Sequence, residues 1–344
     1  MFPDFLSVYA SPGNEPQPQE TVRQGAEAER LGVASIWVSE KWEGKEAGAI
    51  CGAMSQVTQR IRIVAGLIKA SARHPLAAAG LGATMQRLTG NRFALGIGRS
   101  SPEQQKRQGM PVFSEARLAD YASILKRLWV GEEVSYQGPL GDFPKLALLQ
   151  IPQVPPDIIL GASGPKTLAL GGRSFDGVVL HPFLTVDGVR RSVQAVRDAA
   201  VAAGRTPSDV KITACVVTAP DYLSEAELVE ALHVRAVGYL RNPAQAKPLV
   251  EFNGWDMGPV EDLAKTDVRF LEPRGADAAR VKEMRLQASK LLPEAWLRDG
   301  AAVGDLHTCA SRLRAYKDTG VDEILVHGLT SMRLAPLVER LGIP

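Results

Sequence analysis

The stretch Arg60–Ser101, RIRIVAGLIKASARHPLAAAGLGATMQRLTGNRFALGIGRSS, decides the fold. Its first part, Arg60–Ile68, is almost continuously apolar; an Arg-His-Pro step and small apolar residues follow up to Gly90, and Arg92–Gly98 is apolar again. Two apolar strands joined by a helix are typical of a βαβ unit, whose strands are parallel and covered on both faces. Chemistry on such a scaffold is expected at the carboxyl ends of the strands, where this unit ends in Gly98-Arg99-Ser100.

The same alternation of apolar strands and helical segments continues on both sides of this unit. Further strands are expected at residues 4–10, 35–40, 157–162, 177–182, 211–217 and 323–327, and further helices at 19–31, 47–58, 114–129, 186–203, 306–319 and 334–341, with one more opening at 164–166. Eight strands alternating with eight helices predict an α/β fold of the (β/α)8 TIM-barrel type, a single domain over residues 1–344. A doubly wound open sheet would instead place Gly-x-Gly-x-x-Gly after the first strand, where this chain has SPGNEPQP.

Two segments interrupt the alternation. Residues 223–304 have a polar, helical pattern broken at Gly and Pro, and we interpret them as a helical insertion between strands seven and eight. Such an insertion is suited to be a lid or substrate cover. Residues 133–137 indicate one small strand in a Gly- and Pro-rich surface excursion, and the polar stretch after Gly98 is expected to be a long loop.

Composition excludes several functional classes. The chain is 45% hydrophobic and 23% charged with a net charge of +2, which is typical of a globular protein and too small to indicate a nucleic-acid partner. No apolar run approaches the roughly eighteen residues of a membrane span, and no targeting segment is apparent at the start. The separated cysteines Cys51, Cys215 and Cys309 predict reduced core thiols in a cytoplasmic protein without a metal site.

Three longer motifs carry a family resemblance. They are IRIVAGLIKASARHPLAAAGLGATMQRLTGNRFALGIGRS, DIILGASGPKTLALGGRSFDGVVLHP and DLHTCASRLRAYKDTGVDEILVHG. In this order and spacing the chain resembles the luciferase-like monooxygenase family, flavin- and deazaflavin-dependent oxidoreductases on TIM barrels, over nearly its whole length. Within that family it looks most like the actinobacterial branch that uses coenzyme F420 rather than FMN.

The resemblance implies an F420-dependent oxidoreductase that transfers a hydride between C5 of the deazaflavin and a small organic substrate, with the ring lying across the strand ends. An FMN-dependent monooxygenase that uses oxygen and a separate reductase is the alternative, and a non-catalytic barrel is a third. In the family, a bulge with a non-proline cis peptide bond in strand three backs the ring. The matching residues here are Ala65, Gly66 and Leu67, although Gly66 could equally relieve crowding in a barrel strand.

Two strand-to-helix turns qualify as anion sites, because free backbone amides at such turns bind phosphate. They are Gly98-Arg99-Ser100 and Ser163-Gly164-Pro165-Lys166. By resemblance, these turns contact the coenzyme, whose tail is an anionic oligoglutamate. Five cations fall in loops expected at the same barrel face and would attract that tail over a long range, more weakly in high salt: Arg73, Arg99, Lys106, Arg107 and Lys166.

Two candidate acid–base residues, Glu40 and Lys41, lie at the end of strand two. The sugar-phosphate dehydrogenase of this superfamily carries Asp-His at the end of strand two, whereas this chain has Glu40-Lys41, which puts a sugar-phosphate substrate in doubt. Glu40 is a candidate cofactor contact and catalytic residue. Lys41 could donate a proton if burial lowers its pKa, or could simply be a lysine on the rim.

Histidines and tryptophans near the strand ends complete the candidates. His181 and His327 end strands six and eight and are alternative acid–base residues, whereas His74 is expected to order its helix start. Trp42 could close over the ring, and Trp37 is expected in the core.

Oligomerisation follows from the resemblance, because family members commonly pair through barrel helices. A homodimer or higher homo-oligomer is therefore expected, with the apolar stretches Ala47–Val57 and Leu76–Met85 as possible contact faces. The substrate and the direction of hydride transfer remain open at this stage.

Overall fold

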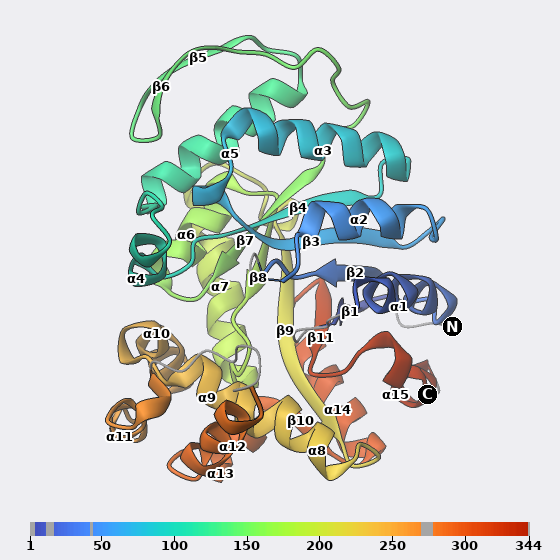
Figure 1. Ribbon diagram of the computed structural model, residues 1–344, viewed down its shortest axis with the longest axis vertical. Helices are drawn as coiled ribbons and strands as arrows, with labels where there is room; N and C mark the ends of the chain where they lie inside the picture. The colour runs from blue at the N-terminus through green and yellow to red at the C-terminus, as the bar shows by residue number, and fades with distance from the viewer. Residues whose placement is uncertain (1–3, 12–16, 42–43, 270–277, 343–344) are drawn as a thin grey trace.

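The computed structural model describes residues 4–11, 17–41, 44–269 and 278–342. Eight parallel strands form its centre (Figure 1). They are β1 Leu6–Ala10, β2 Ser35–Val38, β3 Arg62–Lys69, β4 Phe93–Gly98, β7 Asp157–Ala162, β8 Gly177–Leu180, β9 Lys211–Pro220 and β11 Glu323–His327. Each pairs with the next, and β11 pairs with β1, so the sheet closes on itself. The predicted (β/α)8 barrel is confirmed, and the open doubly wound sheet is excluded.

Eight helices surround the strands in the predicted alternation. They are α1 Pro18–Arg30, α2 Ala47–Ser55, α3 Pro75–Thr89, α5 Glu115–Trp129, α6 Pro165–Ser174, α7 Val186–Ala202, α14 Leu306–Lys317 and α15 Ala335–Gly342. Local sequence explains several of their ends. The side chain of Ser114 accepts from the amide of Arg117 at 3.2 Å and begins α5, and Gly90 ends α3 in the left-handed conformation at φ +62°.

Two apolar layers hold the barrel together. Inside it, one inward side chain from each of several strands forms a compact cluster: Trp37, Val64, Ala94, Ile159, Val179, Cys215 and Leu325. Outside it, the opposite faces of the strands pack under the helices. Trp37 is therefore core, as predicted. The three cysteines are buried and unpaired, which agrees with the prediction of reduced core thiols.

The insertion between β9 and β11 is helical, and its elements gather at the lower end of the view in Figure 1. They are α8 Glu225–Leu228, the π-helix η3 Val229–Val234, α9 Arg235–Leu240, α10 Pro243–Asn253, α11 Gly258–Ala264, α12 Ala278–Ser289 and α13 Glu294–Asp299. Short 3₁₀ turns occur at η1 Ala70–Ala72, η2 Pro207–Asp209, η4 Asp267–Arg269 and η6 Ser331–Arg333. Among the described residues, no helix combines the length and apolarity needed to cross a bilayer.

Three local expectations were wrong. The insertion ends not in helix but in a ninth strand, β10 Ala301–Gly304, which pairs with residues 217–220 of β9. This is possible because β9 is longer than expected and extends past the barrel, which leaves an edge for another strand. The excursion near 133–137 is a hairpin of two strands, β5 Val134–Gly138 and β6 Gly141–Leu146, at the top of Figure 1. The polar loop after β4 contains the short helix α4 Pro102–Arg107, whose start Ser101 caps.

Candidate functional site

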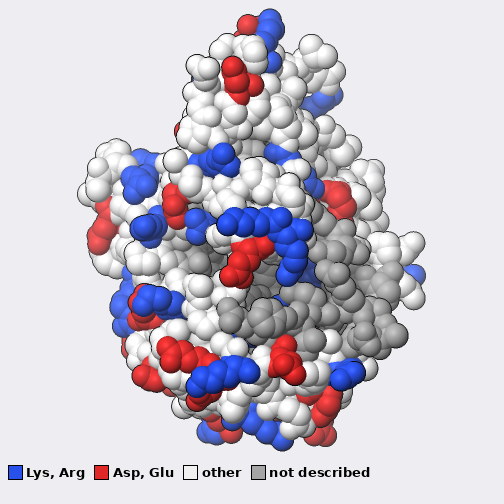
Figure 2. Space-filling view, turned by 60° about the vertical axis from the view of Figure 1, so that its left-hand side comes forward, with Lys and Arg blue, Asp and Glu red and all other residues white. Residues whose placement is uncertain are grey.

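The predicted cofactor residues meet at one rim of the barrel. Strands β2, β3, β4 and β7 are consecutive parallel neighbours, so their carboxyl ends carry Glu40, Gly66, Gly98 and Ser163 at the same end of the molecule. Two contacts connect them: the amide of Lys69 donates to Glu40 Oε2 at 3.1 Å, and Lys69 is the register partner of Gly98. Figure 2 shows the side of the molecule where α4 and α10 lie, with acidic and basic side chains close together on it.

The Glu40 carboxylate is buried at this rim and forms an ion pair with Arg73. The Glu40 side chain is 0% exposed, and Arg73 donates to both carboxylate oxygens, from Nη1 at 2.7 Å and from Nη2 at 2.6 Å. The same guanidinium also pairs with Glu46. Because no carboxylate surface remains exposed, the expectation that Glu40 contacts the ring or transfers a proton is not supported. Its contacts indicate a residue that orders the rim, and Arg73 is not free to attract an anionic tail.

A backbone irregularity in β3 shapes the floor of the rim. The Gly66-Leu67 peptide bond is cis, as the resemblance implied, and the pairing with β4 shifts register between Ala65 and Ile68. Leu67 fills a recess bordered by glycines on the neighbouring strands. A Cβ placed on Gly161 would lie 2.4 Å from Leu67 Cδ1, so a side chain there would displace it.

The two predicted anion turns differ. At the first, Ser100 has φ +45° and Arg99 pairs with Glu115 at 2.9 Å. At the second, the amides of Ser163 and Gly164 both donate to Thr167 Oγ1 at 3.2 Å. Both amides therefore already have an acceptor in this structure, and the contact of this turn with the coenzyme stays a prediction. Pro165 and Lys166 are exposed there.

The insertion is seated against both turns. A Cβ on Gly164 would lie 3.1 Å from Pro248 of α10, and Asn242, which caps α10, donates to Glu103 Oε2 of α4 at 3.2 Å. At the other end of α10, Asn253 donates to the carbonyl oxygen of Phe183, in the loop after β8, at 2.8 Å. The insertion thus lies over the carboxyl ends of β4, β7 and β8.

A cluster of polar rings lies at the same ends of β1, β8 and β11. Tyr239 on α9 stacks edge-on against His181, with ring centroids 5.0 Å apart, and its hydroxyl lies 3.1 Å from His327 Nε2. Tyr9 lies 5.1 Å from the His327 ring, and Arg235 Nη1 donates to His327 Nε2 at 3.1 Å. The two histidines predicted from the strand ends are therefore brought together.

The sequence-based reasoning missed Tyr9, Arg235 and Tyr239. Tyr9 could have been found, because it is the penultimate residue of the first strand and so faces the strand ends. Arg235 and Tyr239 lie four residues apart on one helix, but nothing in the sequence connected that helix to the barrel rim.

Burial keeps this cluster uncharged. It lowers the pKa of His181 and, together with the positive charges of Arg235 and Lys41, holds the pKa of His327 well below its usual value. Burial also raises the pKa of Tyr239 to about 12. Because the charge of Lys41 acts on His327, Lys41 lies near the cluster, at the rim. Trp42, predicted to close over the ring, lies outside the described residues.

Two buried polar atoms at the rim have no hydrogen-bond partner among the described residues. They are Ser39 Oγ, just past β2, and His327 Nδ1, at the end of β11; only β1 separates these two strands. A buried polar group without a partner costs about 1–3 kcal/mol, so proteins rarely retain one without use. The two atoms fit a polar ligand that supplies the missing partners.

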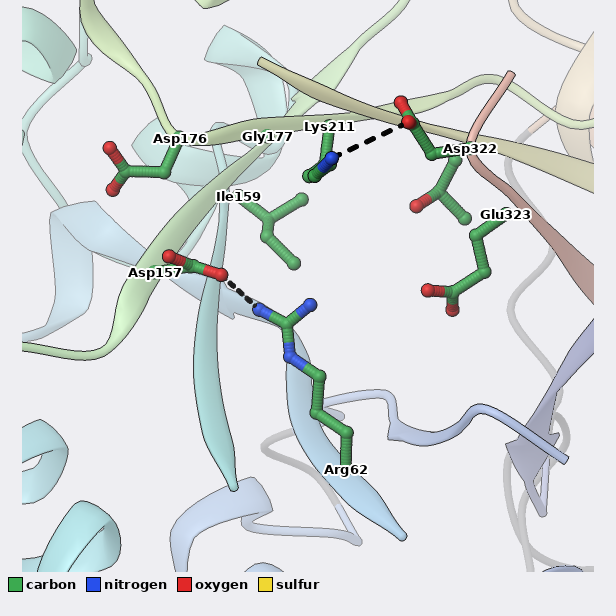
Figure 3. Close-up of a pocket in the computed structure, with 9 residues that line it drawn as sticks. Arg62, Asp157, Ile159, Asp176, Gly177, Lys211, Asp322 and Glu323 are labelled. Carbon is green, nitrogen blue, oxygen red and sulfur yellow. Dashed lines mark hydrogen bonds and ion pairs between the residues drawn. The ribbon is translucent and has the colours of Figure 1, made fainter. Parts of the chain in front are cut away.

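A cavity of about 320 Å³ lies at the opposite end of the barrel. It is lined where strands begin, by residues that include Arg62, Asp157, Lys211 and Asp322 (Figure 3). Arg62 pairs with Asp157 at 2.5 Å and Lys211 with Asp322 at 3.7 Å, so its charges largely satisfy one another. Because barrel enzymes place chemistry at the carboxyl ends of strands, we assign this end to stability.

The fold and rim define a (β/α)8 barrel with a polar mouth, and comparison with known proteins identifies its family. The family model described as luciferase-like monooxygenase matches residues 4–323, and the chain belongs to this family. An F420-dependent glucose-6-phosphate dehydrogenase of Kribbella flavida is 25% identical over 94% of this chain and 96% of its own length. The corresponding enzyme of Amycolatopsis mediterranei is 27% identical, but the match spans 57% of this chain and 63% of that protein.

Two further relatives complete the comparison. A putative coenzyme F420-dependent oxidoreductase of Mycobacterium tuberculosis is 26% identical over 90% of both chains. Among solved structures, the F420-dependent tetrahydromethanopterin reductase of Methanopyrus kandleri superposes with a TM-score of 0.79 at 16% identity, over 99% of this chain and 97% of the other. An F420-dependent secondary alcohol dehydrogenase gives 0.74 at 17% identity, over 98% of both. These structures establish the shared fold.

Proposed function

We propose that this protein is an F420-dependent oxidoreductase that moves a hydride between C5 of the deazaflavin and a small organic substrate. The observation that carries the proposal is the unpartnered buried Ser39 Oγ, which follows β2 directly beside the Gly66-Leu67 bulge of β3. A heterocycle with both donors and acceptors along its edge suits such a rim. Family membership and the F420-dependent relatives support the same conclusion.

When bound, F420 would supply or accept the hydride, and the chain's own part is to position, enclose and handle the proton. Leu67 and the packed side chains below it form an apolar floor to the rim. The insertion, seated on the turns after β4, β7 and β8, would exclude water from the other side.

His181 is the residue we propose for proton transfer. Its Nδ1 lies 2.7 Å from the carbonyl oxygen of Pro182, which can only accept, so Nδ1 carries the proton and Nε2 is free to accept one. Burial lowers the His181 pKa and keeps this base neutral near pH 7. Lys41, whose charge acts on His327, is the second candidate.

The anionic tail of F420 would follow the turns Gly98-Arg99-Ser100 and Ser163–Lys166. Arg99 and Lys166 both lower the pKa of Glu115, although the backbone amide of Glu115 is the larger cause, so the two cations lie near one another. Thr167 would have to release the Ser163 and Gly164 amides for them to bind phosphate directly. A tail held by such partly exposed cations would dissociate more readily as salt is raised.

A binding titration tests the proposal. Purified protein should quench F420 fluorescence saturably at micromolar concentrations and should retain no FMN. His181→Asn should keep the F420 dissociation constant while lowering turnover about 10²-fold or more, the usual contribution of a general acid or base. Yellow protein as purified, with FMN bound and no F420 quenching, would favour the FMN-dependent monooxygenase instead. Unchanged turnover in His181→Asn would remove His181 from the mechanism.

A further inference from the structure

One positive charge at the rim has no acidic partner. Arg235 Nε donates to the carbonyl oxygen of Ala231 at 3.1 Å, and Nη1 donates to His327 Nε2 at 3.1 Å. Among the described residues, no carboxylate lies within 4.0 Å of this guanidinium. Arginine has five N–H donors in a rigid fork, so donors remain after these two contacts.

No described group near Arg235 carries a negative charge, and the nearby Lys41 adds a second positive one. Its charge acts on Tyr9 and Cys215 of the barrel, on Tyr239 of its own helix and on His327 of β11. Burial raises the pKa of Tyr9, Cys215 and Tyr239 and lowers that of His327, and each of these shifts favours the uncharged form. A partly buried charge is normally compensated by a counter-ion, and no side chain in the part of the chain that the structure describes supplies one.

The contact with Arg235 also determines the proton position on His327. Because a guanidinium can only donate, Nε2 of the neutral imidazole must accept, and the ring proton then lies on Nδ1. That Nδ1–H is buried, in a residue only 5% exposed, and has no acceptor among the described residues. Arg235 and His327 therefore form a contacting pair of donors that lacks an acceptor.

Two backbone features lie next to Arg235 and His327. The helix that carries Arg235 begins directly after the π-helix η3, a feature that is frequent at functional sites. Gly328, at φ +104° just past β11, admits η3: a Cβ there would lie 3.2 Å from both Ala231 Cβ and the carbonyl oxygen of Thr218.

We propose that Arg235 and His327 bind an anionic group of the substrate, a carboxylate or a phosphate, beside the reacting carbon. An anion would compensate the charge of Arg235, and its oxygens would accept from donors that have no other partner. The inference rests on the proposed function, because it assigns the substrate class to the same rim. It implies that neutral alcohols and ketones are poorer substrates than analogues that carry a carboxylate or a phosphate.

Calorimetric titration of the full chain with acetate and with inorganic phosphate, at constant ionic strength, tests this subsite with and without F420. We expect saturable binding of at least one anion, weakened about tenfold or more in Arg235→Met, as for loss of a charge-assisted hydrogen bond. Arg298→Met is the matched control, since Arg298 is exposed on α13 and paired with Glu294. Arg235→Lys, which keeps the charge, should recover part of the affinity, and circular dichroism verifies that each variant folds.

Each outcome decides between assignments. The tighter of the two anions names the substrate group, carboxylate or phosphate. No saturable binding to the wild-type chain, or equal loss in Arg298→Met, overturns the subsite. If Arg235→Met weakens F420 binding as much as anion binding, the arginine holds the cofactor and the inference is wrong. If the wild-type chain does not bind F420 but does bind the anion through Arg235, the proposed function fails while the anion site stands.

Discussion

The ion pair between Glu40 and Arg73 allows the sharpest test of how the rim is built. We consider Glu40→Gln, which keeps the shape of the side chain and removes its charge. In the wild-type chain the carboxylate is 0% exposed and accepts from two guanidinium nitrogens and from the Lys69 amide. Arg73, whose side chain is 16% exposed, would be left with Glu46 as its remaining acidic contact.

The magnitude follows from burial. Removing one partner of a buried ion pair costs about 3–5 kcal/mol, because the other charge is left uncompensated. Since Glu46 still contacts Arg73, we expect the lower end of that range, about 3 kcal/mol of unfolding free energy. Glu46→Gln is the matched control: its side chain is 52% exposed, and loss of such a surface pair costs about 1 kcal/mol or less.

Urea unfolding followed by circular dichroism measures both variants, and an F420 titration accompanies it. The reasoning predicts a large loss of stability in Glu40→Gln with cofactor affinity nearly retained under folding conditions. It would be refuted if the two variants were equally stable. If Glu40→Gln remained as stable as wild type and bound F420 tenfold more weakly, the expectation that the Glu40 carboxylate contacts the cofactor would hold instead.

Two further predictions concern the barrel interior and the ring cluster. Gly66→Ala should lower the unfolding free energy by about 1–3 kcal/mol through overpacking, because its Cβ would lie 2.3 Å from the buried Trp37 ring; Gly80→Ala, with open space in α3, should be neutral or stabilising in the same urea assay. His327 has a folded-state pKa well below 6.5, so the unfolded chain binds its proton more readily and stability decreases as the pH is lowered. Between pH 8 and pH 5.5 the wild-type chain should lose about 1.4 kcal/mol more than His327→Gln. Equal pH slopes in wild type and His327→Gln would mean that His327 titrates normally.

The repeating pattern around residues 60–101 was sufficient to predict the barrel. Apolar runs with strand length, separated by helices with identifiable caps, leave few ways to cover both faces of a parallel sheet. The same reasoning correctly placed Glu40, Gly66, Gly98 and Ser163 at one rim, because parallel neighbours must end together. It also placed His181 and His327 there.

Side-chain partners were decided by the tertiary structure alone. Whether Glu40 faces a ligand or an arginine depends on Arg73, thirty-three residues away, and whether the Ser163 amide is free depends on Thr167. A short segment such as β10, Ala301–Gly304, becomes a strand only because β9 extends far enough to pair with it.

In the insertion, the sequence pattern and the tertiary structure decide different things. From its pattern, the chain by itself determined that residues after β9 would be largely helical and inserted between two barrel strands. Only the folded molecule brings Arg235 and Tyr239 to His327, across 92 and 88 residues of sequence. Local hydrophobic periodicity sets which residues form a helix, whereas packing between distant segments sets which of their side chains meet and therefore what the rim can bind.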